Sequence, residues 1–307
     1  MGRYVIRRLG QMVVVLFGAT IVLFGCLFVL PSDPVGSLGG DKARDPAVIE
    51  ALRERYGLND PLPVQYGNFV KNLVQGDLGE DFTQRRPVTE VLQPKLVNTA
   101  ELALLAIVLD IAIGLFAGLI AALFRYSFWD VLITLLTTMA VGFPSFVIGM
   151  VFQKVFVIQL EWVPLISDGT FKSMILPAFV LAILDAALVA RLMRGTMLEV
   201  LRADYVKTAV AKGLPRRTVL VKHVMRNSII PVVTYLGISF GSLLGGALIT
   251  EAIFNWDGIG LALVQAVQQQ NNPIIIGVVT FGVAVFVLLN LIVDLLYAVL
   301  DPRIRLA

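Results

Sequence analysis

Charged side chains are scarce in this sequence of 307 residues, in which Asp, Glu, Lys and Arg together make up 15%. Soluble domains average about 25% charged residues. Uncharged runs of about 20 residues, the length needed to cross a bilayer, recur along the chain. These two features exclude an ordinary water-soluble enzyme.

Cysteine and histidine each occur once, as Cys26 and His223. A single cysteine excludes a disulfide framework and a thiolate metal cage, and a single histidine excludes a multi-histidine site. The sequence also lacks the G-x-x-x-x-G-K-[ST], H-E-x-x-H and C-x-x-C signatures. We therefore expect no catalytic residue, metal site or cofactor in this chain. Energy for any work that the protein does must then come from an ion gradient, a substrate gradient or another subunit.

Apolar stretches predict an all-α integral membrane protein with six transmembrane helices. The first stretch, Met12 to Leu30, has no charged residue in 19 positions. It is too long for the apolar part of a secretory signal peptide, so we expect an uncleaved anchor. The other five spans are predicted at Leu102 to Phe124, Val131 to Gln153, Met174 to Ala190, Ser228 to Thr250 and Pro273 to Leu300. Gly142 and Pro144 should kink the third span.

Basic residues orient these spans. Nine Lys and Arg residues lie between Arg191 and Arg226, whereas the loop from Glu251 to Asn272 has none. Because short cytoplasmic loops are enriched in Lys and Arg, both termini are predicted to be cytoplasmic. The expected organisation is an N-terminal transmembrane helix (1–30), an external helical insert (31–95) and a core of five transmembrane helices (96–307) that contains a cytoplasmic loop (191–227).

Two short helices are predicted in the external insert. Asp45 can cap the first, which opens with Pro46. The second carries an apolar stripe at helical spacing, formed by Tyr66, Phe69, Val70 and Leu73. Such a stripe either caps the first membrane helices or docks an external protein, and composition favours neither.

The predicted cytoplasmic loop contains a short helix with defined ends. Asp204 suits its N-cap, Gly213 suits a left-handed residue after its end, and Pro215 prevents continuation. Isolated helices shorter than about 12 residues are marginal in water, so this helix needs something to pack on. The alternatives are anionic lipid headgroups and a groove on a cytoplasmic protein.

The loop also resembles a known family. The run from Asp204 to Pro215, followed by Lys222 to Pro231, resembles the EAA-type loop of binding-protein-dependent ABC importer permeases, in the form found in B-type subunits of the dipeptide and oligopeptide branch. Further segments resemble landmarks of that family in the same order along the chain: Pro31 to Val35, Tyr56 to Leu62, Gln75 to Gly79, Glu251 to Gly260 and Leu296 to Arg305.

The resemblance implies a set of partners. It implies a second homologous permease, two ABC ATPase subunits that bind ATP and Mg, and an external substrate-binding protein, all at a bacterial plasma (inner) membrane. It implies no nucleic-acid partner and no cofactor in this chain. ATPase coupling would fall to the loop helix, through Asp204, Tyr205, Lys207, Thr208, Ala209, Lys212 and Gly213. The implied cargo is a dipeptide or oligopeptide, but nickel, haem, glutathione and oligosaccharide are alternatives within the same family.

Three aspartates lie inside the predicted spans: Asp110 and Asp185 well inside, and Asp294 in the cytoplasmic half of the last one. Ionisable groups at such depth are costly and normally face a water-filled cavity or a partner. Asp110 and Asp185 therefore either line a translocation pathway or bond neighbouring helices. They are also the basis for an alternative of a different class, an ion-coupled secondary carrier.

Small residues on the spans predict close helix packing. Gly237, Gly241 and Gly245 repeat every four residues on the fifth span, and Gly114 and Gly118 do so on the second. A face of small residues allows two helix backbones to approach closely. The partner could be another helix of this chain or a second permease.

Overall fold

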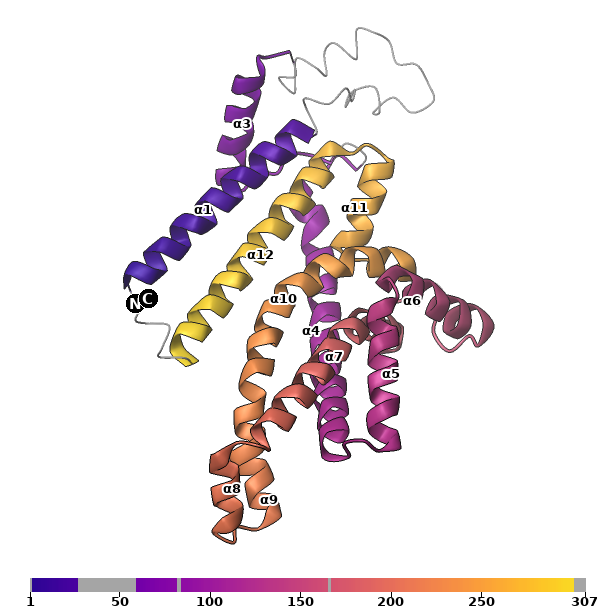
Figure 1. Ribbon diagram of the computed structural model, residues 1–307. Helices are drawn as coiled ribbons and strands as arrows, with labels where there is room; N and C mark the ends of the chain where they lie inside the picture. The colour runs from indigo at the N-terminus through magenta and orange to yellow at the C-terminus, as the bar shows by residue number, and fades with distance from the viewer. Residues whose placement is uncertain (1, 27–58, 82–83, 165–166, 301–307) are drawn as a thin grey trace. The chain divides into compact units, whose positions relative to one another are not determined.

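The computed structural model describes residues 2–26, 59–81, 84–164 and 167–300 (Figure 1). These residues form helices and their connections, with a single β-bridge between Glu80 and Pro87. The chain divides into two compact units, one comprising residues 1–99, 257–298 and 305–307 and the other residues 100–256 and 299–304.

The described helices agree with an all-α membrane protein. Four of them are long and apolar enough to cross a bilayer, and the number rises to six if each of two broken helix pairs counts as one span. The predicted fold class is therefore confirmed. The number of six spans and the cytoplasmic side of the termini remain predictions.

The first unit contains α1 (Gly2–Phe24), α3 (Leu62–Val74), the start of α4 (Val88–Leu123), α11 (Ile259–Gln268) and most of α12 (Asn272–Leu300). Helix α1 begins about ten residues before the predicted span, because short charged stretches do not stop a helix. The predicted end at Leu30 and the helix expected after Asp45 lie outside the described residues.

The second predicted helix of the insert is confirmed as α3. Its stripe lies on α1, where the Tyr66 ring contacts Phe17 and Phe24 at centroid distances of 6.1 and 5.3 Å. The Tyr66 hydroxyl also lies 3.1 Å from Thr20 Oγ1. Of the two expectations for this stripe, the structure shows packing on the first helix.

Helix α11 was not predicted, because its ten residues are too few for a membrane span and fall in a stretch expected to be a loop. The preceding Asn255 has a left-handed backbone, with φ 49°, which ends α10. The Thr99 side chain of α4 accepts a hydrogen bond of 3.0 Å from the Ile259 N–H at the start of α11. The N-terminal part of α4 packs on α11 and α12 through Val88, Leu92, Ile259, Ala262, Ala266, Ile274 and Val278.

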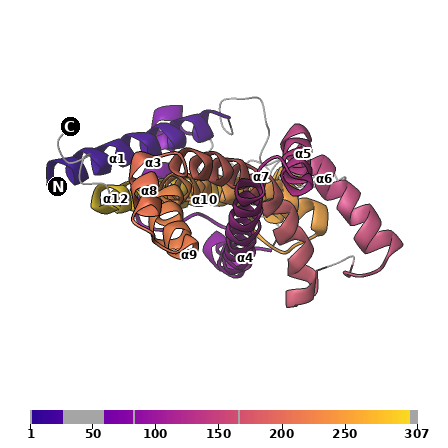
Figure 2. The same ribbon diagram turned by 60° about the horizontal axis from the view of Figure 1, so that its bottom comes forward.

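The second unit contains the rest of α4 and eight further elements (Figure 2). They are α5 (Phe128–Gly142), α6 (Ser145–Phe152), the π-helical η3 (Gln153–Gln159), α7 (Phe171–Val200), α8 (Asp204–Ala211), α9 (Arg216–Thr218), the π-helical η4 (Val219–Met225) and α10 (Arg226–Phe254).

The third predicted span is two helices rather than one kinked helix. α5 ends at Gly142 and α6 starts at Ser145, with an angle of 104° between α5 and the segment Ser145–Gln159. Phe143 is extended, with φ −104° and ψ 138°, because a residue before proline is disfavoured in the helical region. The predicted position of the distortion at Gly142 and Pro144 is confirmed.

Close packing at Gly114 and Gly118 is also confirmed, with α7 as the partner helix. A Cβ atom at Gly114 would lie 2.6 Å from Val189 Cγ1, and one at Gly118 would lie 2.6 Å from the Ala190 carbonyl oxygen. Both distances are far below van der Waals contact. The absence of side chains at these two positions therefore sets the separation of α4 and α7.

Candidate functional site

Helix α8 is the predicted coupling helix, and its start differs from expectation by one residue. The N-cap is Ala203, which makes no side-chain capping bond, and Asp204 occupies the first helical turn. The Asp204 carboxylate still suits the positive end of the helix dipole there. It also accepts a hydrogen bond of 2.8 Å from Lys207 Nζ.

The end of α8 follows the sequence prediction. Gly213 has φ 75°, in the left-handed region. Its N–H donates to the Val210 carbonyl at 2.9 Å, and the Leu214 N–H donates to the Ala209 carbonyl at 3.3 Å. These two bonds form a Schellman motif, which satisfies carbonyl groups that the helix leaves without partners.

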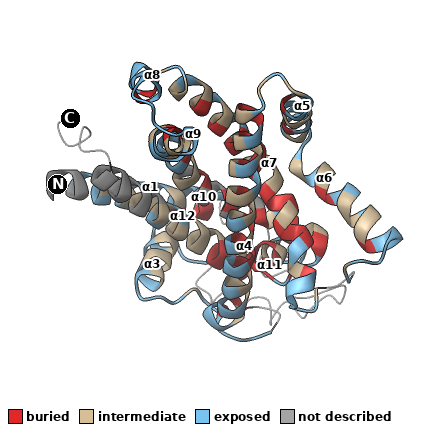
Figure 3. Ribbon diagram, turned by 90° about the horizontal axis from the view of Figure 1, so that it is seen from below, coloured by how far each residue is buried: buried red, intermediate tan, exposed pale blue. Residues whose placement is uncertain are grey.

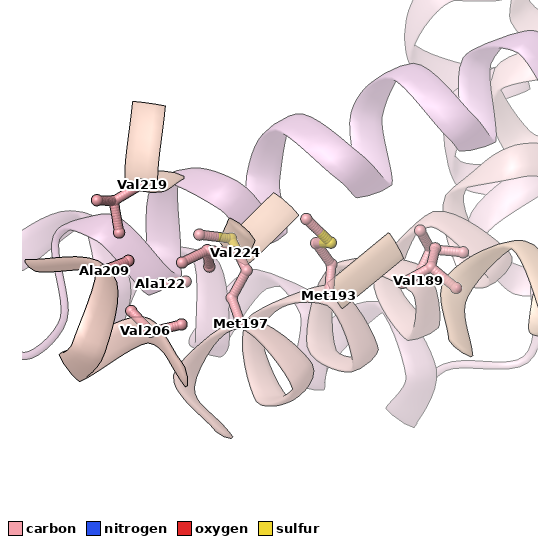
Figure 4. Packing of buried hydrophobic residues seen from close by; sticks show 9 residues of the cluster. Ala122, Val189, Met193, Met197, Val206, Ala209, Val219 and Val224 are labelled. Carbon is pink, nitrogen blue, oxygen red and sulfur yellow. The ribbon is translucent and has the colours of Figure 1, made fainter. Parts of the chain in front are cut away.

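Helix α8 is anchored by one face and exposed on the other. Val206 and Ala209 are buried in a cluster with Met197, Val224 and Ala122, next to which they lie in Figure 4. The opposite face, largely pale blue in Figure 3, is exposed. It presents Asp204, Tyr205, Lys207, Thr208 and Lys212.

The coupling residues named from the sequence therefore separate into two groups. Ala209 faces the chain's own core, where it holds α8 in place. Tyr205 is exposed, yet its hydroxyl accepts a hydrogen bond of 3.1 Å from Asn227 Nδ2 at the start of α10. The exposed polar residues, together with Gly213, remain available to another molecule.

A partly buried ion pair that sequence reasoning missed joins α5 to α7. Arg194 Nε donates to Asp130 Oδ1 at 2.6 Å, and Arg194 Nη2 donates to Asp130 Oδ2 at 2.9 Å. The Tyr126 N–H adds a third bond to Asp130, of 2.9 Å. Each charge lies near the end of an apolar stretch. Two opposite charges at span ends are a signal that could have suggested such a pair.

The two intramembrane aspartates lie at the same level of the α4–α7 contact. Gly114 faces Ala186 and Val189 of α7. Gly118, four residues further along α4, faces Ala190 and Met193, which lie four residues further along α7. The two helices therefore run in the same direction, and one turn back from Gly114 brings Asp110 level with Asp185.

The environments of these aspartates differ. Asp110 is 1% exposed, and neither of its carboxylate oxygens has a hydrogen-bond partner. Asp185 is partly exposed, and its Oδ1 accepts a hydrogen bond of 3.1 Å from the Tyr235 hydroxyl of α10. Sequence reasoning named both aspartates but missed Tyr235, which resembles any other aromatic residue of a span.

Asp185 borders a cavity of about 570 Å³ at the break between α5 and α6. The walls are residues 141–145 of the break, Leu181, Leu184, Asp185 and Leu188 of α7, and Leu243 and Thr250 of α10. Asp110 is not part of the wall. Of the two predicted pathway residues, the structure brings Asp185 to a cavity and places Asp110 in the protein interior.

The small-residue face of α10 stays a prediction. Gly237, Gly241 and Gly245 lie in this helix. The side-chain surroundings of Gly241 and Gly245 lie outside the described part of the structure.

Comparisons with known proteins cover nearly the whole chain. Residues 114–306 match the family described as "Binding-protein-dependent transport system inner membrane component", and residues 1–103 match its N-terminal companion. The glutathione transport system permease protein GsiC of Escherichia coli K12 is 38% identical over 302 residues, which cover 98% of each chain. The dipeptide transport system permease protein DppB of Alkalihalophilus pseudofirmus is 37% identical over 330 residues, covering 98% of this chain and 99% of the relative.

One solved structure supports the fold. It is an amino acid ABC transporter with histidines, which matches with a TM-score of 0.53 and 18% identity over 70% of this chain and 94% of its own. The description of the matching family as an inner membrane component agrees with the apolar helices. The chain therefore belongs to the family of inner-membrane permease components of binding-protein-dependent transport systems.

Proposed function

We propose that this chain is the permease subunit of an ATP-driven importer that carries short peptides across the bacterial inner membrane. A dipeptide permease and a glutathione permease are both similar to it over nearly their whole length. Both names denote small peptides with free amino and carboxylate groups. The cargo proposed is therefore a dipeptide or oligopeptide, with glutathione as the second candidate.

The observation that carries the coupling role is the anchored yet exposed helix α8. Val206 and Ala209 fix it to a core formed by α4, α7, η4 and α10. Its outer face has no covering among the described residues, and it offers polar and charged side chains to a partner. We assign that partner as an ATPase subunit rather than lipid headgroups. The outer face presents Asp204 as well as Lys207 and Lys212, and Asp204 pairs with Lys207. This face therefore carries mixed charge, whereas segments that bind anionic lipid gather about four to eight Lys and Arg residues.

The packing of α8 supplies a route for motion. A displacement of α8 would move α7, because Met193 and Met197 share the buried cluster with Val206. It would also move α5, which Arg194 links to α7. Closure of two ATPase subunits on ATP and Mg could thus rock one group of helices against another.

The proposed assembly contains a second homologous permease, two ATPase subunits and an external binding protein. In it, this chain hydrolyses nothing and holds no cofactor, because ATP and Mg belong to the ATPase subunits. An ion-coupled carrier is disfavoured by the family assignment and by α8, which a carrier does not need.

Reconstitution tests the proposal. The complete complex in proteoliposomes should take up a labelled dipeptide only with binding protein outside and ATP on the ATPase side. Labelled glutathione, measured in parallel, distinguishes the two cargo candidates. Uptake driven by a proton gradient in vesicles that contain this chain alone would contradict the proposal and restore the carrier alternative.

A further inference from the structure

The cavity at the break between α5 and α6 has the features of a binding site. Non-helical backbone at membrane depth is tolerated only where it is buried in protein or lines a water-filled cavity. Gly142, Phe143 and Pro144 interrupt the helix and also form part of the cavity wall. Its volume of about 570 Å³ lies within the range of small-molecule sites, about 300 to 1,000 Å³.

One side of this cavity carries an acidic side chain. Asp185 is the single ionisable side chain among the residues described as lining it. It lies midway along α7, fourteen positions from Phe171 and fifteen from Val200. Neither Asp185 nor Asp110 forms an ion pair within the described part of the chain. Carboxylates in apolar surroundings are costly unless a cation compensates them, so this site favours a cationic ligand.

Asp110 is an independent observation that points the same way. It is almost fully buried, it has no hydrogen-bond partner, and it lies level with Asp185 on the neighbouring helix. Its carboxyl group provides no compensating positive charge for Asp185. The hydroxyl of Tyr235 fixes the Asp185 carboxylate from the α10 side.

Another part of the wall favours an anion. Helix α6 begins at Ser145, which lines the cavity, and its N-cap Pro144 makes no side-chain capping bond. The Pro144 carbonyl accepts from the N–H groups of Val147 and Ile148, at 3.0 and 3.3 Å. The N–H groups of Ser145 and Phe146 precede these and have no intrahelical acceptor. The positive end of a helix dipole stabilises a carboxylate at such a position.

We propose that this cavity is a transit site for a zwitterionic peptide, with the α-ammonium group at Asp185 and the α-carboxylate at the N-terminus of α6. The proposal rests on the proposed function and adds to it the cargo contacts within the permease. Asp185 accepts charge-assisted hydrogen bonds from the ammonium group. Asp110 is not among the residues that line the cavity and does not touch the cargo.

Protection of an introduced cysteine tests this site. The experiment uses the assembled permease–ATPase complex without binding protein, in a Cys26→Ser background that removes the exposed native thiol. A cysteine is introduced at the wall by Leu184→Cys. Alanyl-alanine at millimolar concentration should slow its modification by a small thiol reagent. N-acetyl-alanyl-alanine, which lacks the ammonium group, should require a concentration about 10-fold to 100-fold higher, as expected for loss of a charged hydrogen bond.

Two variants complete the test. Asp185→Asn should raise the half-protecting concentration of alanyl-alanine by about 10-fold to 100-fold and abolish the difference between the two probes. Glu199→Gln removes a carboxylate from an exposed position of the same helix and should leave protection unchanged.

The outcomes separate the site from the function. Equal protection by alanyl-alanine and N-acetyl-alanyl-alanine in the Leu184→Cys complex, which retains Asp185, would overturn the proposed site. This result does not depend on whether the Asp185→Asn variant assembles. Full protection by alanyl-alanine in Asp185→Asn, or a complex that transports the dipeptide but shows no protection, would overturn it too. Absence of dipeptide uptake by the parent complex with its binding protein would instead refute the proposed function.

Discussion

Arg194 donates two parallel hydrogen bonds of 2.6 and 2.9 Å to the Asp130 carboxylate. These bonds link the start of α5 to the part of α7 that packs against α8. The Asp130 side chain is 5% exposed and that of Arg194 is 30% exposed. The Arg86–Glu90, Lys95–Asp257 and Lys207–Asp204 pairs, by contrast, each include a side chain that is more than half exposed. The Asp130–Arg194 pair therefore stabilises the contact between α5 and α7 and also couples movement of one helix to the other.

Replacing Asp130 with Asn should destabilise the assembled complex by about 3 kcal/mol, because it leaves the Arg194 charge without its partner in a largely buried place. Arg194→Lys should also destabilise it, since an ammonium group cannot form the two parallel bonds. Thermal melting of the purified complex measures both effects. Asp204→Asn is the control for stability, because Asp204 forms an ion pair with Lys207 at an exposed position. An equal loss for both aspartates would contradict the assigned role of Asp130.

Gly213→Val should reduce uptake and substrate-stimulated ATPase activity together while leaving the membrane helices inserted. A Cβ at this position would meet nothing within 4 Å, so the effect comes from the backbone φ of 75° and not from a clash. A β-branched residue in that conformation costs about 1 kcal/mol or more and would redirect the chain that enters Pro215.

Gly213→Asn is the matched control for this prediction. Asn adopts the left-handed conformation more readily than other residues with side chains, so it should retain most of the coupling. Normal uptake and ATPase activity in a well-assembled Gly213→Val complex would remove the argument for α8 as the coupling helix. The lipid-surface alternative would then be favoured.

Gly118→Ala should destabilise the second unit, although alanine is the better helix former. The added methyl group would lie 2.6 Å from the backbone oxygen of Ala190, which no side-chain rearrangement can relieve. Gly195→Ala on α7 is the control, because nothing lies within 4 Å of its Cβ position. It should be neutral, or stabilising by up to about 1 kcal/mol. Comparison of melting temperatures and assembly yields decides the matter.

Cysteines introduced at Lys71 and Lys212, each in the Cys26→Ser background, test the predicted topology. Lys71 lies on α3 in the expected external insert, and Lys212 follows α8 in the expected cytoplasmic loop. A membrane-impermeant reagent added outside intact cells should modify the first and spare the second. The reverse pattern would invert the topology and would place α8 beyond the reach of an ATPase.

Local rules predicted the elements whose signals lie within a few residues. The apolar stripe from Tyr66 to Leu73 predicted α3. Gly142 and Pro144 located the break before α6, and Gly213 located the end of α8. The one-residue error at Asp204 is of the same local kind. A good capping side chain does not guarantee the N-cap position when the first helical turn also favours a carboxylate.

Contacts between distant segments could not be predicted in this way. The Asp130–Arg194 pair depends on α5 lying beside α7. The level of Asp110 relative to Asp185 depends on how Gly114 and Gly118 set the register of α4 on α7. Helix α11 was missed for a different reason, because a search for long apolar windows does not detect ten residues.

The seven π-helical residues of η4, between α9 and α10, affect how side chains on α10 are rotated about the helix axis relative to those before η4. A π-helical turn contains an extra residue, and each residue advances a helix by about 100° around its axis. η4 therefore sets the rotation of α10 about its axis relative to the coupling loop. Deletion of the exposed Val221 should convert this segment to a regular α-helix. It should rotate α10 relative to α8, so that movement of α8 would no longer be passed correctly to α10 although both helices are intact.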